Sequence, residues 1–170
     1  EDKFYLTRNN VGKVRASKSR DGEINLKILF GGREPNEKWE YRGEFPFNSK
    51  EYSVGHPSID RSGNVLYFAS DMPGGYGGSD IYFSTFSNGY WSDPINLGPN
   101  VNTESNEFFP YISNDGVLYF SSEGHGGLGG LDIFFSVPER GVFNVVENMG
   151  YPVNSPKDDF SFILDETGTQ

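Results

Sequence analysis

A repeat of 52 residues constrains the fold of this chain more than any other feature of its sequence. The segment LYFASDMPGGYGGSDIYFS at 66–84 matches LYFSSEGHGGLGGLDIFFS at 118–136 without a gap, and the two begin 52 residues apart. At the same spacing, NLG at 96–98 pairs with NMG at 148–150, and VNT at 101–103 pairs with VNS at 153–155. A period of this length is typical of propellers and other repeat architectures, in which each repeat is one supersecondary unit.

The match extends less regularly to both ends of the chain. FYLTRNN at 4–10 resembles LYFASDM, FNS at 47–49 corresponds to VNT and VNS, and Trp39 stands where Trp91 stands. FSFILDETG at 160–168 resembles FPYISNDG at 109–116. The chain therefore holds most of one repeat, two complete repeats and the start of a fourth.

Each period carries about four strand signals separated by turn signals. In the third repeat the strand signals are FFPYIS, VLYFSS, DIFFSV and VFNVVENM. Asp115-Gly116 predicts a hairpin of the type in which both central residues have positive φ. The consecutive apolar residues Leu118, Tyr119 and Phe120 indicate a strand that is covered on both faces.

These observations predict an all-β fold, a β-propeller of four-stranded antiparallel blades. The 22 glycines, 10 prolines and 15 phenylalanines agree with many strands and tight turns. We expect a divergent blade over 1–53, incomplete at its N-terminus, blades over 54–107 and 108–159, and the first strand of a further blade over 160–170. Closed propellers usually need about 4–8 blades. Since about three and a half are present, we expect the sequence to be part of a longer chain or to be completed by another molecule.

The glycine tracts raise the question of a nucleotide site. Gly124, Gly126 and Gly129 spell G-x-G-x-x-G, which accommodates a pyrophosphate when a helix follows. Here the strand signal DIFF follows, and the equivalent tract at 73–80 lacks the spacing. We therefore expect each tract to be a structural connection between the second and third strands of a blade.

Several residues are expected to be structural positions of the repeat. Asp80 and Asp132 begin the third strands, where a carboxylate could bind calcium but more often accepts hydrogen bonds from turn amides. No further acidic residues stand at the alternating spacing of a calcium loop. The repeated carboxylates Glu107 and Asp159 point to contacts between blades. The structural positions are Asp80, Asp132, Gly77, Gly78, Gly129, Gly130, Trp39 and Trp91, with the tryptophans expected in the core between blades.

We expect no catalytic residues, no metal site and no cofactor. The chain lacks cysteine, and its two histidines, His56 and His125, occupy non-equivalent positions that we expect to be turns. A zinc site needs three or four ligands at a plausible spacing. No G-x-S-x-G or other nucleophile motif occurs.

Charge and hydropathy limit the class of partner. A net charge of −10 makes the chain a poor candidate for binding nucleic acid, whose phosphates would repel it. The sequence contains no run of 18 apolar residues, which is about the length that a membrane-spanning helix needs. Tyr76 and Leu128 occupy the same place in the two glycine tracts, where an apolar side chain could contact a protein partner or tuck back onto its blade.

The repeat segments, together with NLGPNVNTESNEFFPYIS at 96–113, resemble the PD40-type, WD40-like propeller repeats of OmpA-family proteins in Bacteroidetes. The resemblance covers nearly the whole chain, although the first blade has Asn25, Leu26 and Lys27 where the others approach with aspartate. It implies a non-enzymatic scaffold in the periplasm, at the inner face of the outer membrane. The implied partners are proteins of the type IX secretion system or the outer membrane. Peptidoglycan would be bound only through domains absent from this chain.

Two other functions stay open on the sequence. The segment could belong to a larger enzyme with a propeller domain, as in prolyl peptidases, in which case a hydrolase domain would adjoin it. It could also bind glycans, because Tyr76, Tyr90 and Trp91 could stack on sugars.

Overall fold

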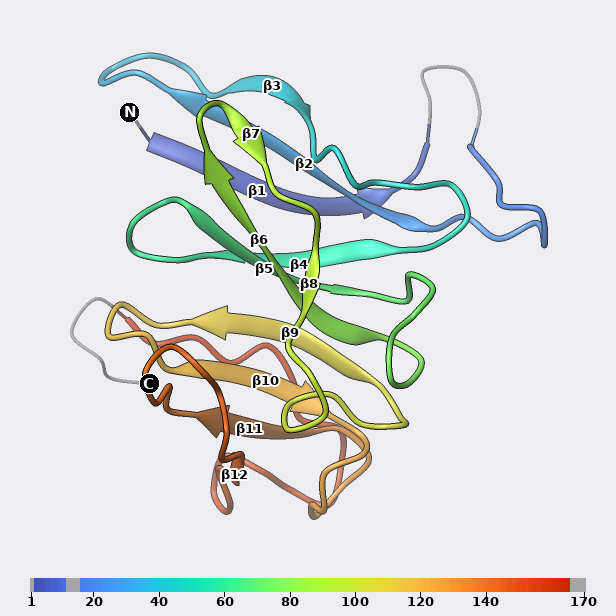
Figure 1. Ribbon diagram of the computed structural model, residues 1–170, viewed down its shortest axis with the longest axis vertical. Coiled ribbons are helices and arrows are strands. Elements are labelled where there is room, and N and C mark those ends of the chain that lie inside the picture. The colour runs from blue at the N-terminus through green and yellow to red at the C-terminus, as the bar shows by residue number, and fades with distance from the viewer. Residues whose placement is uncertain (1, 12–15, 166–170) are drawn as a thin grey trace.

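The computed structural model describes residues 2–11 and 16–165, which contain strands and no helix (Figure 1). The first sheet contains β1 (Asp2–Asn9), β2 (Leu26–Arg33) and β3 (Glu40–Glu44). The second sheet contains β4 (Val54–Ile59), β5 (Val65–Ser70), β6 (Asp80–Ser87), β7 (Tyr90–Trp91) and β8 (Ile95–Asn96). The third sheet contains β9 (Glu107–Ile112), β10 (Leu118–Ser122), β11 (Asp132–Ser136) and β12 (Glu147–Asn148). All strand pairs are antiparallel, and the all-β prediction is confirmed.

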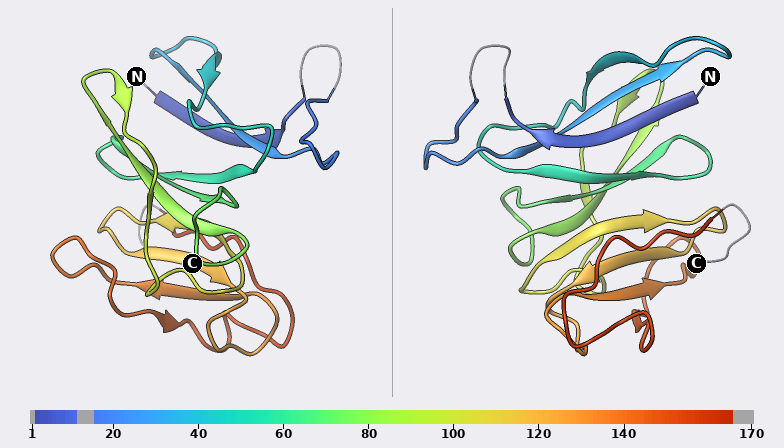
Figure 2. Two further views of the ribbon diagram at one scale, coloured as in Figure 1. Left: turned by 45° about the vertical axis from the view of Figure 1, so that its right-hand side comes forward. Right: turned by 180° about the vertical axis from the view of Figure 1, so that it is seen from behind.

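The three sheets stack face to face, with the second in the middle (Figure 2). The core between the first and second sheets contains Ile28, Phe45, Val54, Leu66, Phe68 and Tyr82. The core between the second and third contains Ile81, Val101, Ile112, Leu118, Phe120, Phe134 and Phe143. Successive side chains of a strand point to opposite faces. Consecutive apolar residues are therefore needed in the middle sheet, because it contributes to both cores.

One asparagine per sheet marks the repeat in three dimensions. In each case the side-chain amide of the asparagine exchanges two hydrogen bonds with the backbone of one isoleucine. The pairs are Asn48 with Ile28, Asn102 with Ile81 and Asn154 with Ile133. These isoleucines lie in β2, β6 and β11, so these three strands are equivalent.

Among the described residues, the first sheet has no counterpart of β4 and β9. Thr7 of β1 pairs with Ile28 as Ala69 of β5 pairs with Ile81, so β1 is equivalent to β5. β4 pairs with the outer edge of β5, and β9 pairs with that of β10. Within residues 2–11 and 16–165, no strand pairs with the outer edge of β1.

Main-chain hydrogen bonds join successive sheets. The backbone N–H of Glu107, at the start of β9, donates to the carbonyl of Ser79 at 2.7 Å. The N–H of Asp159 donates in the same way to the carbonyl of Leu131 at 2.7 Å. The residues just before β6 and β11 therefore anchor the chain where it enters the next repeat.

The outer-edge strands β4 and β9 each contain a bulge and an unusual backbone conformation. The register of β4 shifts between Gly55 and Ser58, and His56 has a φ of 53°. Phe109 of β9 has a φ of 51° at the equivalent place. Positive φ is rare for a bulky residue because its side chain crowds the backbone. The expectation of a turn for His56 is therefore wrong, since the residue lies within a strand.

The last described segment repeats this backbone feature. Ser161 has a φ of 64°, so Ser161 corresponds to Phe109 and Phe160 to Phe108. This correspondence has the same spacing of 52 residues as the repeat in the sequence. Residues 160–165 are assigned to no strand, and 166–170 lie outside the described residues.

The predicted hairpin at Asp115-Gly116 joins β9 to β10, but with a different turn. Gly116 has a φ of 86°, whereas Asp115 does not have positive φ. The hydroxyl of Ser113 donates to the carboxylate of Asp115 at 2.5 Å, and the N–H of Val117 donates to that hydroxyl at 3.0 Å. Of the two central residues, only the second has positive φ, and the side chains of Ser113 and Asp115 add hydrogen bonds to the turn.

Candidate functional site

The glycine tracts form the connections from β5 to β6 and from β10 to β11, at one edge of the stack (Figure 1). In the first connection the carboxylate of Asp80 accepts hydrogen bonds from the N–H groups of Tyr76 at 2.6 Å and Gly77 at 3.1 Å. The Nδ2 of Asn96 donates to the same carboxylate at 2.7 Å. Asp80 thus holds the loop in its conformation, and its oxygen atoms already have protein donors.

Asp132 has the same role in the second connection. Its Oδ2 accepts from the N–H groups of Leu128 at 2.7 Å and Gly129 at 2.9 Å. Its Oδ1 is buried without a hydrogen-bond partner. No group of three or more residues that could hold a metal ion occurs among the described residues.

Close packing explains the glycines. A Cβ atom on Gly77 would collide with the backbone of Thr103 and Ser105, and one on Gly129 would collide with the backbone of Lys157. A Cβ atom on Gly78 would meet the side chain of Asn106, and one on Gly130 would meet the side chain of Asp158. The N–H of Gly78 also donates to the carbonyl of Ser105 at 2.7 Å. The glycines therefore let each tract lie against the chain that leads into the next repeat. The described residues contain no helix, so neither tract lies at the helix N-terminus where a dinucleotide fingerprint places its phosphates.

The repeated carboxylates Glu107 and Asp159 bind the chain just before them. Glu107 is fully buried and accepts from the N–H of Thr103 at 2.8 Å and from the hydroxyls of Thr103 and Ser122 at 2.7 and 2.6 Å. Asp159 accepts from the N–H of Ser155 at 2.6 Å and its hydroxyl at 3.3 Å. These carboxylates have structural partners in the junctions between sheets.

Tyr76 and Leu128 are the apolar residues that the two tracts leave uncovered. Their side chains are 51% and 54% exposed. Their backbone N–H groups are held by Asp80 and Asp132, so both side chains stand on ordered loops. The structure thus presents two equivalent apolar side chains at one edge of the stack.

The two tryptophans are equivalent in position but differ in burial. Trp91 is partly buried and meets Phe45 at 5.6 Å between the first and second sheets. Trp39 is 51% exposed, lies 5.5 Å from Phe4 and has the Arg33 guanidinium 4.5 Å above its ring. The described residues form no sheet on the side of Trp39, so its expected place in a core between blades stays a prediction. Trp91, packed among aromatic rings, does not present the open face that stacking on a sugar requires.

The histidines do not share a site. His56 stacks on Phe109 with ring centroids 4.1 Å apart, and burial lowers its pKa. Its Nδ1 is buried without a hydrogen-bond partner, and the residue borders a cavity of about 250 Å³ between β4 and β9. His125 lies in the second glycine tract, where its Nε2 is 2.9 Å from the carbonyl oxygen of Val101.

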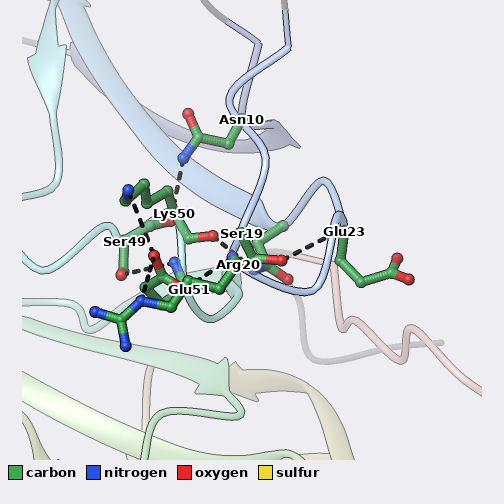
Figure 3. Close-up of polar contacts among 8 residues, drawn as sticks. Asn10, Ser19, Arg20, Glu23, Ser49, Lys50 and Glu51 are labelled. Atoms are coloured by element: carbon green, nitrogen blue, oxygen red, sulfur yellow. Dashed lines mark hydrogen bonds and ion pairs between the residues drawn. The ribbon is translucent and has the colours of Figure 1, made fainter.

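A polar cluster ties the turn at 19–23 to residues 49–51 (Figure 3). The N–H of Arg20 donates to the carboxylate of Glu51 at 3.1 Å, and the Lys50 ammonium lies 3.5 Å from that carboxylate. The hydrogen bond from Arg20, and next the Lys50 side chain, lower the pKa of Glu51. These side chains satisfy one another on the surface, so we assign the cluster a structural role.

We call the paired hydrogen bonds of Asn48, Asn102 and Asn154 with isoleucine backbones the asparagine clamps. The repeat in the sequence aligned these asparagines but did not predict their role. The matches among FNS, VNT and VNS place Asn48, Asn102 and Asn154 in register, which was the available signal. Their role depends on isoleucines about 20 residues away, so only the fold reveals it.

Comparison with known proteins adds no relative. The sequence matches no protein-family model, and no curated protein matches it. Within the described residues, no helix is long and apolar enough to cross a membrane.

Proposed function

We propose that this chain is a segment of a β-propeller that serves as a protein-binding scaffold in the bacterial envelope. Three consecutive antiparallel sheets, stacked and joined by equivalent clamps and junctions, support the propeller arrangement. The resemblance to envelope propellers supports a periplasmic location at the outer membrane. In this proposal the chain has no catalytic role and acts by holding partner proteins.

The observation that carries the binding role is the pair Tyr76 and Leu128. Each lies at the tip of a connection whose polar groups are used in holding the loop. Burying a half-exposed aromatic or aliphatic side chain against a partner is favourable by about 1–2 kcal/mol. Two such side chains at equivalent places in neighbouring repeats fit a protein surface that spans both loops.

A photo-crosslinking experiment tests this role. A benzophenone amino acid replaces Tyr76 or Leu128, and Tyr90, which is 79% exposed in β7, provides the control position. We expect positions 76 and 128 to crosslink to the same outer-membrane or secretion protein in envelope fractions of the source bacterium, and position 90 not to. Equal crosslinking at all three positions, or none at 76 and 128, would contradict the proposal.

A further inference from the structure

Within the part of the chain that the structure describes, nothing covers one face of the first sheet and no strand pairs with the outer edge of β1. On the face turned away from the second sheet, Leu6 is 40% exposed, Trp39 51% and Tyr41 61%. Phe4, Leu6 and Leu29 line a hollow of about 690 Å³ on this face. In the second and third sheets the equivalent face packs against the preceding sheet. An unpaired strand edge beside apolar side chains is a template for adding another strand.

The segment 159–164 has the features of a strand that fits such an edge. It lies beside the third sheet, where Phe162 contacts Tyr119 with ring centroids 4.7 Å apart. Its other side is open, since Phe160 is 54% exposed and Ile163 71%. The positive φ of Ser161 repeats the bulge of β4 and β9, the strands that pair with β5 and β10.

The registers of the complete sheets predict how this segment would pair with β1. In the third sheet, Glu107 of β9 pairs with Ser122 of β10. Thr7 pairs with Ile28 as Ser121 pairs with Ile133, so the next residue of β1, Arg8, is equivalent to Ser122. Asp159 holds the place of Glu107. A segment added in the same register therefore sets Asp159 opposite Arg8, a carboxylate facing a guanidinium. The remaining pairs are Phe160 with Thr7, Ile163 with Tyr5 and Leu164 with Phe4.

The aromatic contacts between sheets point to the same arrangement. In both existing interfaces a tyrosine meets a larger or equal ring edge-on: Tyr5 meets Trp91 at 6.3 Å and 82°, and Tyr67 meets Phe143 at 6.2 Å and 75°. Tyr119 is the equivalent tyrosine of the third sheet. Trp39 is the equivalent ring of the first sheet. Trp91 is paired with Phe86 of β6, and Trp39 lies beside Arg33, which holds the place of Phe86 in β2. Tyr119 and the half-exposed Trp39 therefore complement each other.

The charge distribution favours contact between the two ends. Residues 1–53 contain 11 of the 14 basic residues and 9 of the 24 acidic ones, a net charge of +2. Residues 54–170 contain the other 3 basic and 15 acidic residues, a net charge of −12. Complementary charges raise the rate of encounter and set the orientation of an interface.

We infer that the chain associates head to tail with a second copy of itself. Segment 159–164 of each copy adds to β1 of the other, and the Tyr119 face of the third sheet covers the Trp39 face of the first. Two copies related by a two-fold axis then contribute three sheets each, within the range of about 4–8 blades of closed propellers. The inference rests on the propeller arrangement proposed above, but not on any envelope partner.

A charge exchange tests the pairing of Arg8 with Asp159. The oligomeric state of the 170-residue chain is measured by sedimentation equilibrium, where we expect a dimer. Arg8→Asp and Asp159→Arg, each alone, place like charges together at both contacts of the dimer, so each weakens association by roughly tenfold or more. In an equimolar mixture of the two variants, one contact regains the native pair and the other holds the reversed pair. We expect the mixed dimer to form.

Controls separate this outcome from misfolding. Arg61→Asp makes the same change of charge at an exposed turn of the second sheet and leaves the dimer unchanged. A Trp91→Phe background leaves Trp39 as the remaining tryptophan, and its fluorescence shifts to the blue when copies associate. A monomer at roughly 100 µM, or no recovery on mixing two folded variants, would overturn the inference. Crosslinking at Tyr76 and Leu128 in such a monomer would leave the scaffold proposal standing.

Discussion

The side-chain amide of Asn102 forms two hydrogen bonds with the backbone of Ile81 in β6. Its Nδ2 donates to the Ile81 carbonyl at 2.9 Å, and the Ile81 N–H donates to its Oδ1 at 2.7 Å. Asn102 is 1% exposed. The Ile81 carbonyl also accepts from the N–H of Leu97 at 3.0 Å, so the Asn102 side chain is needed above all as the partner of the buried Ile81 N–H.

Replacing Asn102 with alanine should therefore destabilise the fold. The substitution leaves the N–H of Ile81 unsatisfied, whereas the Ile81 carbonyl still accepts from the N–H of Leu97 at 3.0 Å. An unsatisfied buried donor costs about 1–3 kcal/mol, so we expect the free energy of unfolding in urea to fall by about 2 kcal/mol. Asn100→Ala, at an exposed neighbour, should change it by less than about 0.5 kcal/mol. Similar losses for both variants would contradict the clamp.

The glycines of one tract should differ in their tolerance of alanine. Gly129→Ala places a Cβ against the backbone of Lys157, which cannot move aside without shifting the junction. Overpacking of this kind costs about 1–3 kcal/mol. Gly126 has open space around its Cβ position and no positive φ, so Gly126→Ala should be nearly neutral. Thermal unfolding of the two variants side by side measures the difference.

Glu107 should require its carboxylate. In Glu107→Gln one carboxylate oxygen is replaced by an amide N–H₂ group, which donates hydrogen bonds and cannot accept them. At least one of the hydrogen bonds from Thr103 and Ser122 to this buried side chain is therefore lost. We expect a loss of about 2 kcal/mol in denaturant unfolding. Glu104→Gln removes the same charge at an exposed site three residues earlier and is the matched control. An equal effect of both changes would show that net charge, rather than the buried contacts, matters.

His56 should make stability depend on pH. Its pKa is lowered by burial in the folded state, so the unfolded state binds the proton more readily. This contribution to stability is fully present above the ordinary histidine pKa of about 6.5. It decreases as pH falls through that value toward the lower folded pKa. His56→Phe keeps an aromatic ring on Phe109 and removes the titration. Between pH 7.5 and 5.5, roughly one unit either side of the ordinary pKa, the wild type should lose more stability than the variant; parallel losses would refute the role.

The repeat in the sequence predicted much of the architecture because strand patterns and turn residues act locally. The match of 66–84 with 118–136 corresponds to β5–β6 and β10–β11 and the tracts between them. The half-exposed positions of Tyr76 and Leu128 agree with apolar residues at loop tips.

Features that depend on distant contacts could not be predicted in this way. The burial of Trp39 depends on whether another sheet lies beside it, which no local pattern reports. The positive φ of His56 and Phe109 arises from a bulge between paired strands, and bulky residues give no signal for it. The buried role of Asn102 was hidden in a segment whose composition is typical of a loop.

The hydrogen bonds from Glu107 to Ser79 and from Asp159 to Leu131 bear on how such repeats diverge. Both hydrogen bonds join main-chain atoms and are 2.7 Å long, although the acceptor residue is serine in one junction and leucine in the other, and the donor residue is glutamate in one and aspartate in the other. The spatial relation of one sheet to the next is therefore set by the peptide backbone at both junctions. The side chain at the position of Ser79 and Leu131 can differ without moving the next sheet, whereas a carboxylate is present at both 107 and 159, where it has hydrogen bonds of its own.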